Sequence, residues 1–403
     1  MRRSLLLAAM LLVTSCRDGS RETPAPQPGA PNTPDAAAAA PSGSAARASD
    51  AGSQDSGSAR GAAMSDAELG ALIERLSERP GDFPSDNFVS NETSYLDVAS
   101  ELKKETLRGK AYVGVGPEQN LTYLAMIDPP MAYIVDIRRG NIIEHLVLRA
   151  CMESGSNRAE FVSALTARPV PASLVGREAS ASAKELAEAF SKVAGDASLR
   201  DKGVERSLAL MARLGLKLTS EDRKSVAKIH QEFFKKGLEL AYTMEGSARR
   251  YPSVGSLLAQ TTQDGEAASF LGTEQAWQRV RALMVANRVV PVVGDFLGEK
   301  ALVSIGKDMR ERGLTLGVFY TSNVEQYLFQ DGKYGRFVSN VRALPVDPAS
   351  VLVRVWFDQG RKHPRQREGH RTTSLVMSAQ GFLDRAERKP WRSYWEVTTD
   401  QGG

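Results

Sequence analysis

The sequence contains few of the residues that build disulfides and metal sites. It has 403 residues, of which two are cysteines and four are histidines. Cys16 lies in an N-terminal segment considered below, so Cys151 is left without a partner for an internal disulfide. With so few histidines and no usable cysteine pair, we expect no transition-metal site.

The sequence also lacks the short motifs of several enzyme classes. It has no G-x-S-x-G, no H-E-x-x-H and no G-x-x-x-x-G-K-[ST], which are signatures of serine hydrolases, metalloproteases and P-loop proteins. No charge sign dominates, because 52 lysines and arginines face 48 aspartates and glutamates, for a net charge of +4. We therefore expect no nucleic acid as a partner.

A long apolar run is missing, but a short one opens the chain. Met1-Arg2-Arg3 precedes an apolar run from Leu5 to Val13, and small residues follow. A basic start, a short apolar core and small residues are typical of a secretory signal, and the run is too short to span a membrane. Residues 13–16, VTSC, resemble the lipobox of bacterial lipoproteins. The resemblance implies that residues 1–16 are a lipoprotein signal and that acyl chains on Cys16 anchor the protein to the cell envelope.

The rest of the chain divides into two segments of different composition. Residues 17–63 are rich in Ala, Ser, Pro, Gly and Asp and contain no aromatic residue. Such a segment buries too little apolar surface to fold, so we expect a disordered tether with a reach of about 35–40 Å. Residues 64–403 hold every Trp, Tyr and Phe and predict one large folded domain.

The pattern of residues 64–403 alternates between strands and helices. Ser65-Asp66-Ala67-Glu68 is a capping box that predicts a helix to about Ser77. Residues from about 158 to 288 show helical periodicity with almost no strand candidates. We predict a doubly wound, mostly parallel Rossmann-like α/β sheet, with this helical insertion after its second strand and an antiparallel hairpin at its C-terminal end. The expected strands are residues 111–115, 131–136, 289–293, 314–320, 351–357 and 373–377.

The stretch from Ala111 to His145 has the pattern of a nucleotide-binding βαβ unit. A strand meets a turn at Gly116-Pro117, a helix follows, and a second strand ends on Asp136. An acid at the tip of that strand can accept hydrogen bonds from both hydroxyls of a ribose. The G-x-G-x-x-G fingerprint is broken at its third glycine, which is Gln119 here. The candidate cofactor-binding residues are Gly114, Gly116, Pro117, Glu118, Asp136 and, after a later strand, Asp295.

The same stretch resembles the first two motifs of class I S-adenosylmethionine-dependent methyltransferases. Gly116 matches the first motif glycine and Asp136 the ribose-binding acid, which implies S-adenosylmethionine as a cofactor. The chain departs from the family where Gly114 replaces an acid and where Glu118 and Asn120 replace later glycines. The phrases FVSNETSYL, GVGPEQN, DIRR and YTSNVEQYL also resemble an uncharacterised bacterial lipoprotein family with a methyltransferase-like fold, over most of residues 85–357.

Two further polar stretches are candidates for catalysis or substrate binding. Residues 90–94 precede the first strand, and residues 320–327 follow a later one, where a ligand would bind at the carboxyl end of a sheet. Helix capping is the alternative explanation for both. The candidate catalytic bases are Glu92, Glu325 and Tyr327, and the candidate substrate-binding residues are Tyr95, Arg138, Ser322 and Asn323.

Three interpretations remain open. The first is a methyltransferase-like enzyme with a small-molecule ligand, although S-adenosylmethionine is not expected outside the cytoplasm. The second is a lipid-anchored binding or interaction module that has lost its cofactor, which the broken glycine motif favours. The third is an enzyme of another class, such as a hydrolase, for which no recognised nucleophile is evident. An open crevice beside Gly116 would favour a ligand, and a filled one would favour the interaction module.

Overall fold

The computed structural model describes residues 63–83, 88–244, 249–358 and 360–400. The chain divides into two units, Met1–Asp55 and Ser56–Gly403, and every described residue belongs to the second. The predicted signal, the lipobox with Cys16 and nearly all of the predicted tether lie outside the described residues.

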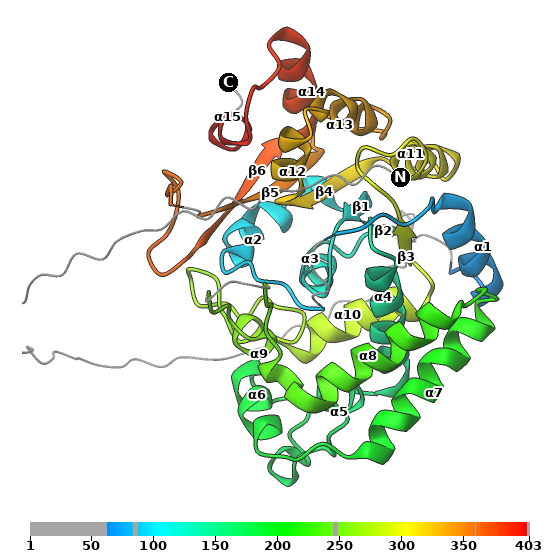
Figure 1. Cartoon of the computed structure of the whole chain (residues 1–403). Coiled ribbons are helices and arrows are strands. Elements are labelled where there is room, and N and C mark those ends of the chain that lie inside the picture. Colours follow the sequence, from blue (N-terminus) through cyan, green and yellow to red (C-terminus); the bar gives the residue numbers. More distant parts are fainter. Residues whose placement is uncertain (1–62, 84–87, 245–248, 359, 401–403) are drawn as a thin grey trace, which may run out of the picture. The chain divides into compact units, whose positions relative to one another are not determined.

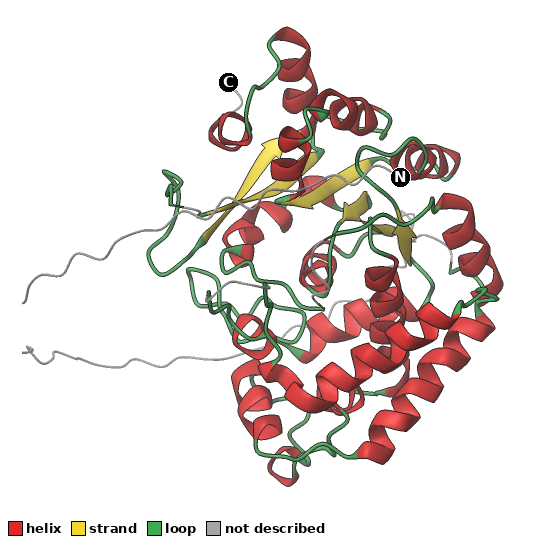
Figure 2. Cartoon of the chain, viewed as in Figure 1, coloured by secondary structure: helices red, strands yellow, loops and turns green. Residues whose placement is uncertain are grey.

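Six strands form one sheet, shown in Figure 2. Their order is β3-β2-β1-β4-β5-β6, and only the β5–β6 pair is antiparallel within this sheet. This arrangement confirms the predicted fold class, a mostly parallel Rossmann-like sheet with an antiparallel hairpin at its C-terminal edge. The strands are β1 Ala111–Gly114, β2 Ala132–Asp136, β3 Val289–Val293, β4 Leu316–Ser322, β5 Val351–Phe357 and β6 Thr372–Ser378.

The strand order reverses between β1 and β4, which are neighbours in the middle of the sheet. In open α/β sheets, ligands bind beyond the carboxyl ends of the strands at such a switch point. Every residue of β1, β2 and β3 is buried, because helices cover both faces of a parallel sheet. If the domain binds a ligand, we therefore expect it at the carboxyl ends of β1, β2 and β4.

The predicted helical insertion is present between β2 and β3. Helix α4 leaves β2 and packs against β2 and β3 on one side and α7, α8 and α10 on the other. Figure 1 shows α7 and α8 lying side by side beneath it. Enclosed in this way, α4 buries each residue from Asn141 to Met152, polar ones included. The helices are α4 Arg139–Ser154, α5 Arg158–Thr166, α6 Ala183–Ser191, α7 Ala197–Arg213, α8 Ser220–Lys236, α9 Val254–Leu258 and α10 Glu274–Val285.

The remaining helices surround the sheet and connect its strands. Helix α1 starts with the predicted capping box, in which the Ser65 hydroxyl accepts from the Glu68 amide and the Glu68 carboxylate accepts from the Ser65 amide. Helix α3 connects β1 to β2, and α11 connects β3 to β4. These helices are α1 Asp66–Leu76, α2 Ala99–Leu102, α3 Gln119–Ile127, α11 Ala301–Glu311, α12 Val324–Gln330, α13 Tyr334–Arg342, α14 Ala379–Arg388 and α15 Tyr394–Thr399.

Strand β4 differs from its predicted position in a way that affects the site. It was expected to end at Tyr320 but continues to Ser322, with a register irregularity between these two residues. Asn323 takes the N-cap position of α12 without a side-chain capping bond. Similarly, residues 90–94 lead into a 3-10 helix, Tyr95–Val98, which α2 continues, but its N-cap residue Ser94 makes no side-chain capping bond. Capping therefore does not explain either polar stretch.

Two glycines in well-defined helices give a matched test of this packing. A methyl group on Gly70 of α1 would lie 1.7 Å from the backbone oxygen of Leu214, whereas one on Gly140 of α4 would meet no atom within 4 Å. Gly70→Ala should therefore destabilise the domain by about 1–3 kcal/mol. Gly140→Ala should be neutral or stabilise it by about 0.4–1 kcal/mol, because it lowers the entropy of the unfolded chain.

Urea denaturation of the full chain, followed by circular dichroism, measures both effects. Equal midpoints for the two variants would contradict the close packing of α1 against the end of α7.

Candidate functional site

The turn after β1 exposes backbone at the switch point. Gly116 has a left-handed φ of +83°, and an added Cβ would meet no heavy atom within 4 Å. Its carbonyl oxygen accepts hydrogen bonds from Asn120 Nδ2 at 3.0 Å, Asn141 Nδ2 at 3.1 Å and His145 Nε2 at 2.9 Å. Helices α3 and α4 thus hold the turn, and open space remains beside it. Pro117, the next residue, is partly buried.

Gly114 has a different role in this structure. A Cβ there would lie 2.1 Å from Asn120 Oδ1 and 2.6 Å from the Tyr112 side chain. Those two side chains share a hydrogen bond of 2.8 Å from the Tyr112 hydroxyl to Asn120 Oδ1. Gly114 therefore makes room for internal packing, whereas the space at the Cβ position of Gly116 is open.

Asp136 lies at the tip of β2, as expected, and is only 5% exposed. One carboxylate oxygen accepts from the Arg138 amide at 2.8 Å and from Arg138 Nε at 3.2 Å, and the other from Arg138 Nη2 at 3.3 Å. The Arg138 guanidinium also lies 6.0 Å from the centre of the Phe83 ring. A ribose at Asp136 would share the carboxylate with Arg138 or displace it.

Two buried glutamates interact with each other near the turn, and Glu144 also interacts with Asp136 and Arg138. Glu118 precedes α3 and accepts from the Ser90 amide at 3.1 and 3.0 Å, and burial raises its pKa to about 8. Glu144 of α4 is 1% exposed, and neither of its carboxylate oxygens has a hydrogen-bond partner among the described residues. Burial, reinforced by the charge of Glu118, raises the pKa of Glu144 well above its usual range.

Other polar atoms around this turn are buried without a partner in the described part of the chain. They are Gln119 Oε1, Asn141 Oδ1 and His145 Nδ1. Because His145 Nε2 must donate to the Gly116 carbonyl, Nδ1 of the neutral ring is an acceptor, as the two amide oxygens are. A buried acceptor without a donor costs about 1–3 kcal/mol. Several such atoms at one strand edge mark a place where a ligand could supply donors.

A second group of polar side chains joins the edge from β4. Glu92 is 2% exposed, and its Oε2 accepts from Gln119 Nε2 and from the Tyr320 hydroxyl, each at 2.7 Å. Its other oxygen accepts from the hydroxyl of Ser322. Burial raises the pKa of Glu92, although these three hydrogen bonds oppose the shift. Ser322 itself is partly buried and has a left-handed φ of +50°.

The structure therefore brings together some of the predicted residues and adds others. Gln119, Asn141, Glu144, His145 and Tyr320 were not predicted as site residues, although Asn141, Glu144 and His145 share the i, i+3, i+4 spacing of one helix face. We call the assembled group the carboxyl-edge cluster. It consists of Glu92, Gly116, Glu118, Gln119, Asp136, Arg138, Asn141, Glu144, His145, Tyr320 and Ser322.

Glu325 does not join this cluster. It is fully buried and pairs with Arg354 Nε at 3.0 Å, while the hydroxyls of Thr321 and Tyr334 donate to its carboxylate. Removing one partner of such a buried ion pair leaves an uncompensated charge and costs several kcal/mol, about 3–5. The contacts of Glu325 are those of a structural residue between β4, β5 and α13.

The other predicted residues lie outside the carboxyl-edge cluster. The Tyr95 hydroxyl donates to the Leu257 carbonyl at 2.8 Å, inside the core. Asp295 accepts from the Leu297 amide at 2.8 Å in a local turn. Tyr327 meets Phe83 edge-on at 5.3 Å and shares a hydrogen bond with Asn323, so both lie next to the ring that Arg138 contacts.

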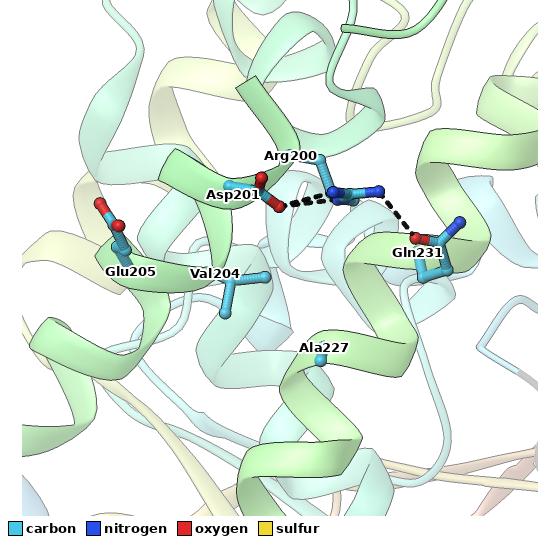
Figure 3. Close-up of a pocket in the computed structure, with 6 residues that line it drawn as sticks. All are labelled: Arg200, Asp201, Val204, Glu205, Ala227 and Gln231. Carbon is cyan, nitrogen blue, oxygen red and sulfur yellow. Dashed lines mark hydrogen bonds and ion pairs between the residues drawn. The ribbon is translucent and has the colours of Figure 1, made fainter. Parts of the chain in front are cut away.

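Two pockets lie away from the carboxyl-edge cluster. Figure 3 shows one on α7 and α8, where Arg200 pairs with Asp201 and donates to Gln231 at 3.1 Å. Its lining residues are Arg200, Asp201, Val204, Glu205, Ala227 and Gln231. Another is lined by residues of β5, β6, α15 and the loop before β6, among them Arg354 and His363.

Within the described ranges, no group of three His, Cys, Asp or Glu side chains is arranged to hold a metal ion. The helices described there are also too short or too polar to cross a membrane. Cys151 is buried in α4, and burial raises the pKa of its thiol to about 12, so it is not a reactive group.

Comparison with known families identifies the domain. A domain of unknown function, DUF7790, matches residues 87–400. The chain belongs to the DUF7790 family. The match covers all six strands and the helical insertion, so the carboxyl-edge cluster lies within the DUF7790 domain.

Other comparisons add little about chemistry. No curated protein sequence matches the chain. Among solved structures, the rRNA methyltransferase aviRa from Streptomyces viridochromogenes is similar over 81% of this chain and 96% of that chain, with 11% identity and a TM-score of 0.29. At that TM-score the likeness carries no argument about the function of the DUF7790 domain.

The raised pKa of Glu118 predicts a pH-dependent stability. The folded state holds this proton up to about pH 8, whereas an unfolded glutamate releases it near pH 4.3. Stability should therefore fall as the pH rises between these values, by up to about 1.4 kcal/mol per pH unit for this group. Glu118→Gln should flatten that part of the profile.

The measurement is a set of urea midpoints between pH 4.5 and 8.5 for the wild type and the variant. Glu311→Gln, at an exposed glutamate of α11, is the control. Parallel profiles for the wild type and Glu118→Gln would show that Glu118 is ionised in the fold.

Proposed function

We propose that this DUF7790 protein binds a small nucleoside-type ligand at the carboxyl edge of its sheet and is held at the bacterial cell envelope by lipid on Cys16. The observation that carries the ligand proposal is Gly116, whose backbone faces open space at the switch point between β1 and β4. Asp136 at the tip of the adjacent strand supports the proposal, because an acid at that position can accept hydrogen bonds from ribose hydroxyls.

The hydrogen-bonding character of the edge supports a nucleoside more than a nucleotide. The unpartnered atoms of Gln119, Asn141 and His145 are acceptors, and they lie among four buried carboxyl groups with one arginine, Arg138. Ribose hydroxyls and an adenine amino group supply donors to such a site. A phosphate supplies no donor to these acceptors.

The residues present fit S-adenosylmethionine in part. Its ribose hydroxyls suit Asp136, and its ammonium group can donate to the unpartnered acceptors of the cluster. When bound, it would supply a methyl group, and the residues of the cluster would hold and orient it. S-adenosylmethionine is a cytoplasmic metabolite, however, so an exported domain calls for testing simpler nucleosides beside it.

A second candidate function is a non-catalytic interaction module on a degenerate methyltransferase-like fold. It is favoured by the internal donors that already occupy two of the acids. Arg138 reaches both oxygens of Asp136, and the Ser90 amide reaches both oxygens of Glu118. In that case the unpartnered acceptors would only cost stability.

Calorimetry on the full chain in detergent distinguishes the two candidates. We expect S-adenosylmethionine, S-adenosylhomocysteine or adenosine to bind, and ADP not to bind. Asp136→Asn keeps the side-chain shape but removes the charged acceptor, so it should weaken binding at least tenfold, in line with about 1.5–3 kcal/mol for a hydrogen bond to a charged group. Asp128→Asn, at an exposed left-handed position after α3, should bind like the wild type.

Absence of binding for S-adenosylmethionine, S-adenosylhomocysteine and adenosine, in a chain whose circular dichroism and melting show that it is folded, would refute the nucleoside proposal. Equal binding by both aspartate variants would place the ligand away from Asp136.

Lipid anchoring is tested separately. If acyl chains on Cys16 hold the protein, Cys16→Ala should leave it soluble or unprocessed, while the wild type should stay in the membrane fraction and extract only with detergent. Cys151→Ala is the control, since this buried thiol should not affect fractionation. An acyl-modified N-terminal peptide in the mass spectrum would identify the site, and an unmodified Cys16 in a membrane-bound chain would contradict the proposal.

A further inference from the structure

The turn from β4 to α12 places a serine in an unusual backbone conformation. Ser322 is the last residue of β4, and its φ of +50° lies in the left-handed region that favours glycine. The chain then turns through Asn323 into α12. Figure 1 shows α12 close to β4. In nucleophile elbows, a sharp strand-to-helix turn of this kind presents a serine hydroxyl at the carboxyl edge of a sheet.

The hydroxyl of Ser322 is paired with a base. It donates to Oε1 of Glu92, a carboxyl group that is 2% exposed. The Ser322 side chain also hydrogen-bonds with Tyr320, and its hydroxyl lies 3.4 Å from Asn323 Oδ1. A nucleophile and a base within hydrogen-bond reach are the first two parts of a catalytic triad.

The base is itself oriented by further groups. Gln119 Nε2 and the Tyr320 hydroxyl both donate to Glu92 Oε2, each at 2.7 Å, which turns Oε1 toward Ser322. Burial favours the protonated form of Glu92, so the carboxylate has a tendency to take up a proton. A glycine would satisfy the turn without strain, but it would leave Glu92 without this donor.

We propose that Ser322 and Glu92 form a nucleophile–base pair for acyl transfer from a small ester. This proposal rests on the end of β4 and does not depend on the nucleoside ligand. The chain departs from the G-x-S-x-G pattern, since Tyr320 and Val324 stand where the glycines would be, so sequence motifs alone do not find the site.

The reaction balances without a metal or an oxidant. The Ser322 oxygen bonds to the carbonyl carbon of the ester while its proton moves to Glu92. The carbon–oxygen bond to the alcohol then breaks, and the alcohol leaves with that proton. Water next adds to the acyl carbon and gives a proton to Glu92, which returns it to the Ser322 oxygen as the acyl group leaves as a carboxylic acid.

The test is covalent labelling of the purified full chain with a fluorophosphonate, followed by peptide mass spectrometry, together with hydrolysis of p-nitrophenyl acetate. We expect the label on Ser322 of the wild type. Ser322→Ala should abolish labelling and reduce hydrolysis to the uncatalysed background. Glu92→Gln removes the base but keeps the shape, and it should slow both by about 100-fold, the usual contribution of a general base.

Two further variants separate catalysis from folding. Ser322→Gly keeps the left-handed turn, so it should melt at or above the wild-type temperature and still fail to label. Ser339→Ala, at an exposed serine of α13, should label and hydrolyse like the wild type. Absence of label in folded wild-type protein, or equal labelling of the wild type and Ser322→Gly, would overturn the proposal.

Discussion

The carbonyl oxygen of Gly116 is the point on which the candidate site depends. Three side-chain amides or ring nitrogens, from Asn120, Asn141 and His145, donate to it. They come from two helices, α3 and α4. Since one backbone atom joins β1 to both helices, the left-handed turn is fixed before any ligand arrives. Such preorganisation lowers the cost of ordering a binding site.

Some buried polar side chains around the Gly116 turn lower the stability of the fold. Glu144, Asn141 and His145 are buried because α4 is enclosed by the sheet and by the insertion, and some of their polar atoms find no partner. A domain with a core as large as this one can tolerate such costs when they are concentrated at one place. In natural proteins, buried polar atoms without partners are found mainly at functional sites. We therefore favour the carboxyl-edge cluster over the pocket on α7 and α8 as the ligand site.

The sequence allowed the fold to be predicted more fully than the site. The glycine turn after Ala111–Val115, the acid at Asp136 and the capping box at Ser65 could be predicted, because each depends on residues close together in the sequence. The fate of Glu325 could not be predicted in that way. A register irregularity between Tyr320 and Ser322 changes which side chains face the sheet edge, and Glu325 turns into the core toward Arg354. The burial of Glu144 could not be predicted, because the burial of α4 depends on helices and strands that are distant in the sequence.

The position of the insertion also has a consequence for the order of folding. Ala132 of β2 pairs directly with Val289 of β3, so neighbouring strands are separated in the chain by the entire helical insertion. During synthesis, one edge of β2 stays exposed until all of α4 to α10 has been made. Contacts of such long sequence separation form late, and unpaired strand edges invite association between chains. Rapid collapse of the helices onto α4 would close the loop and bring β3 to its partner.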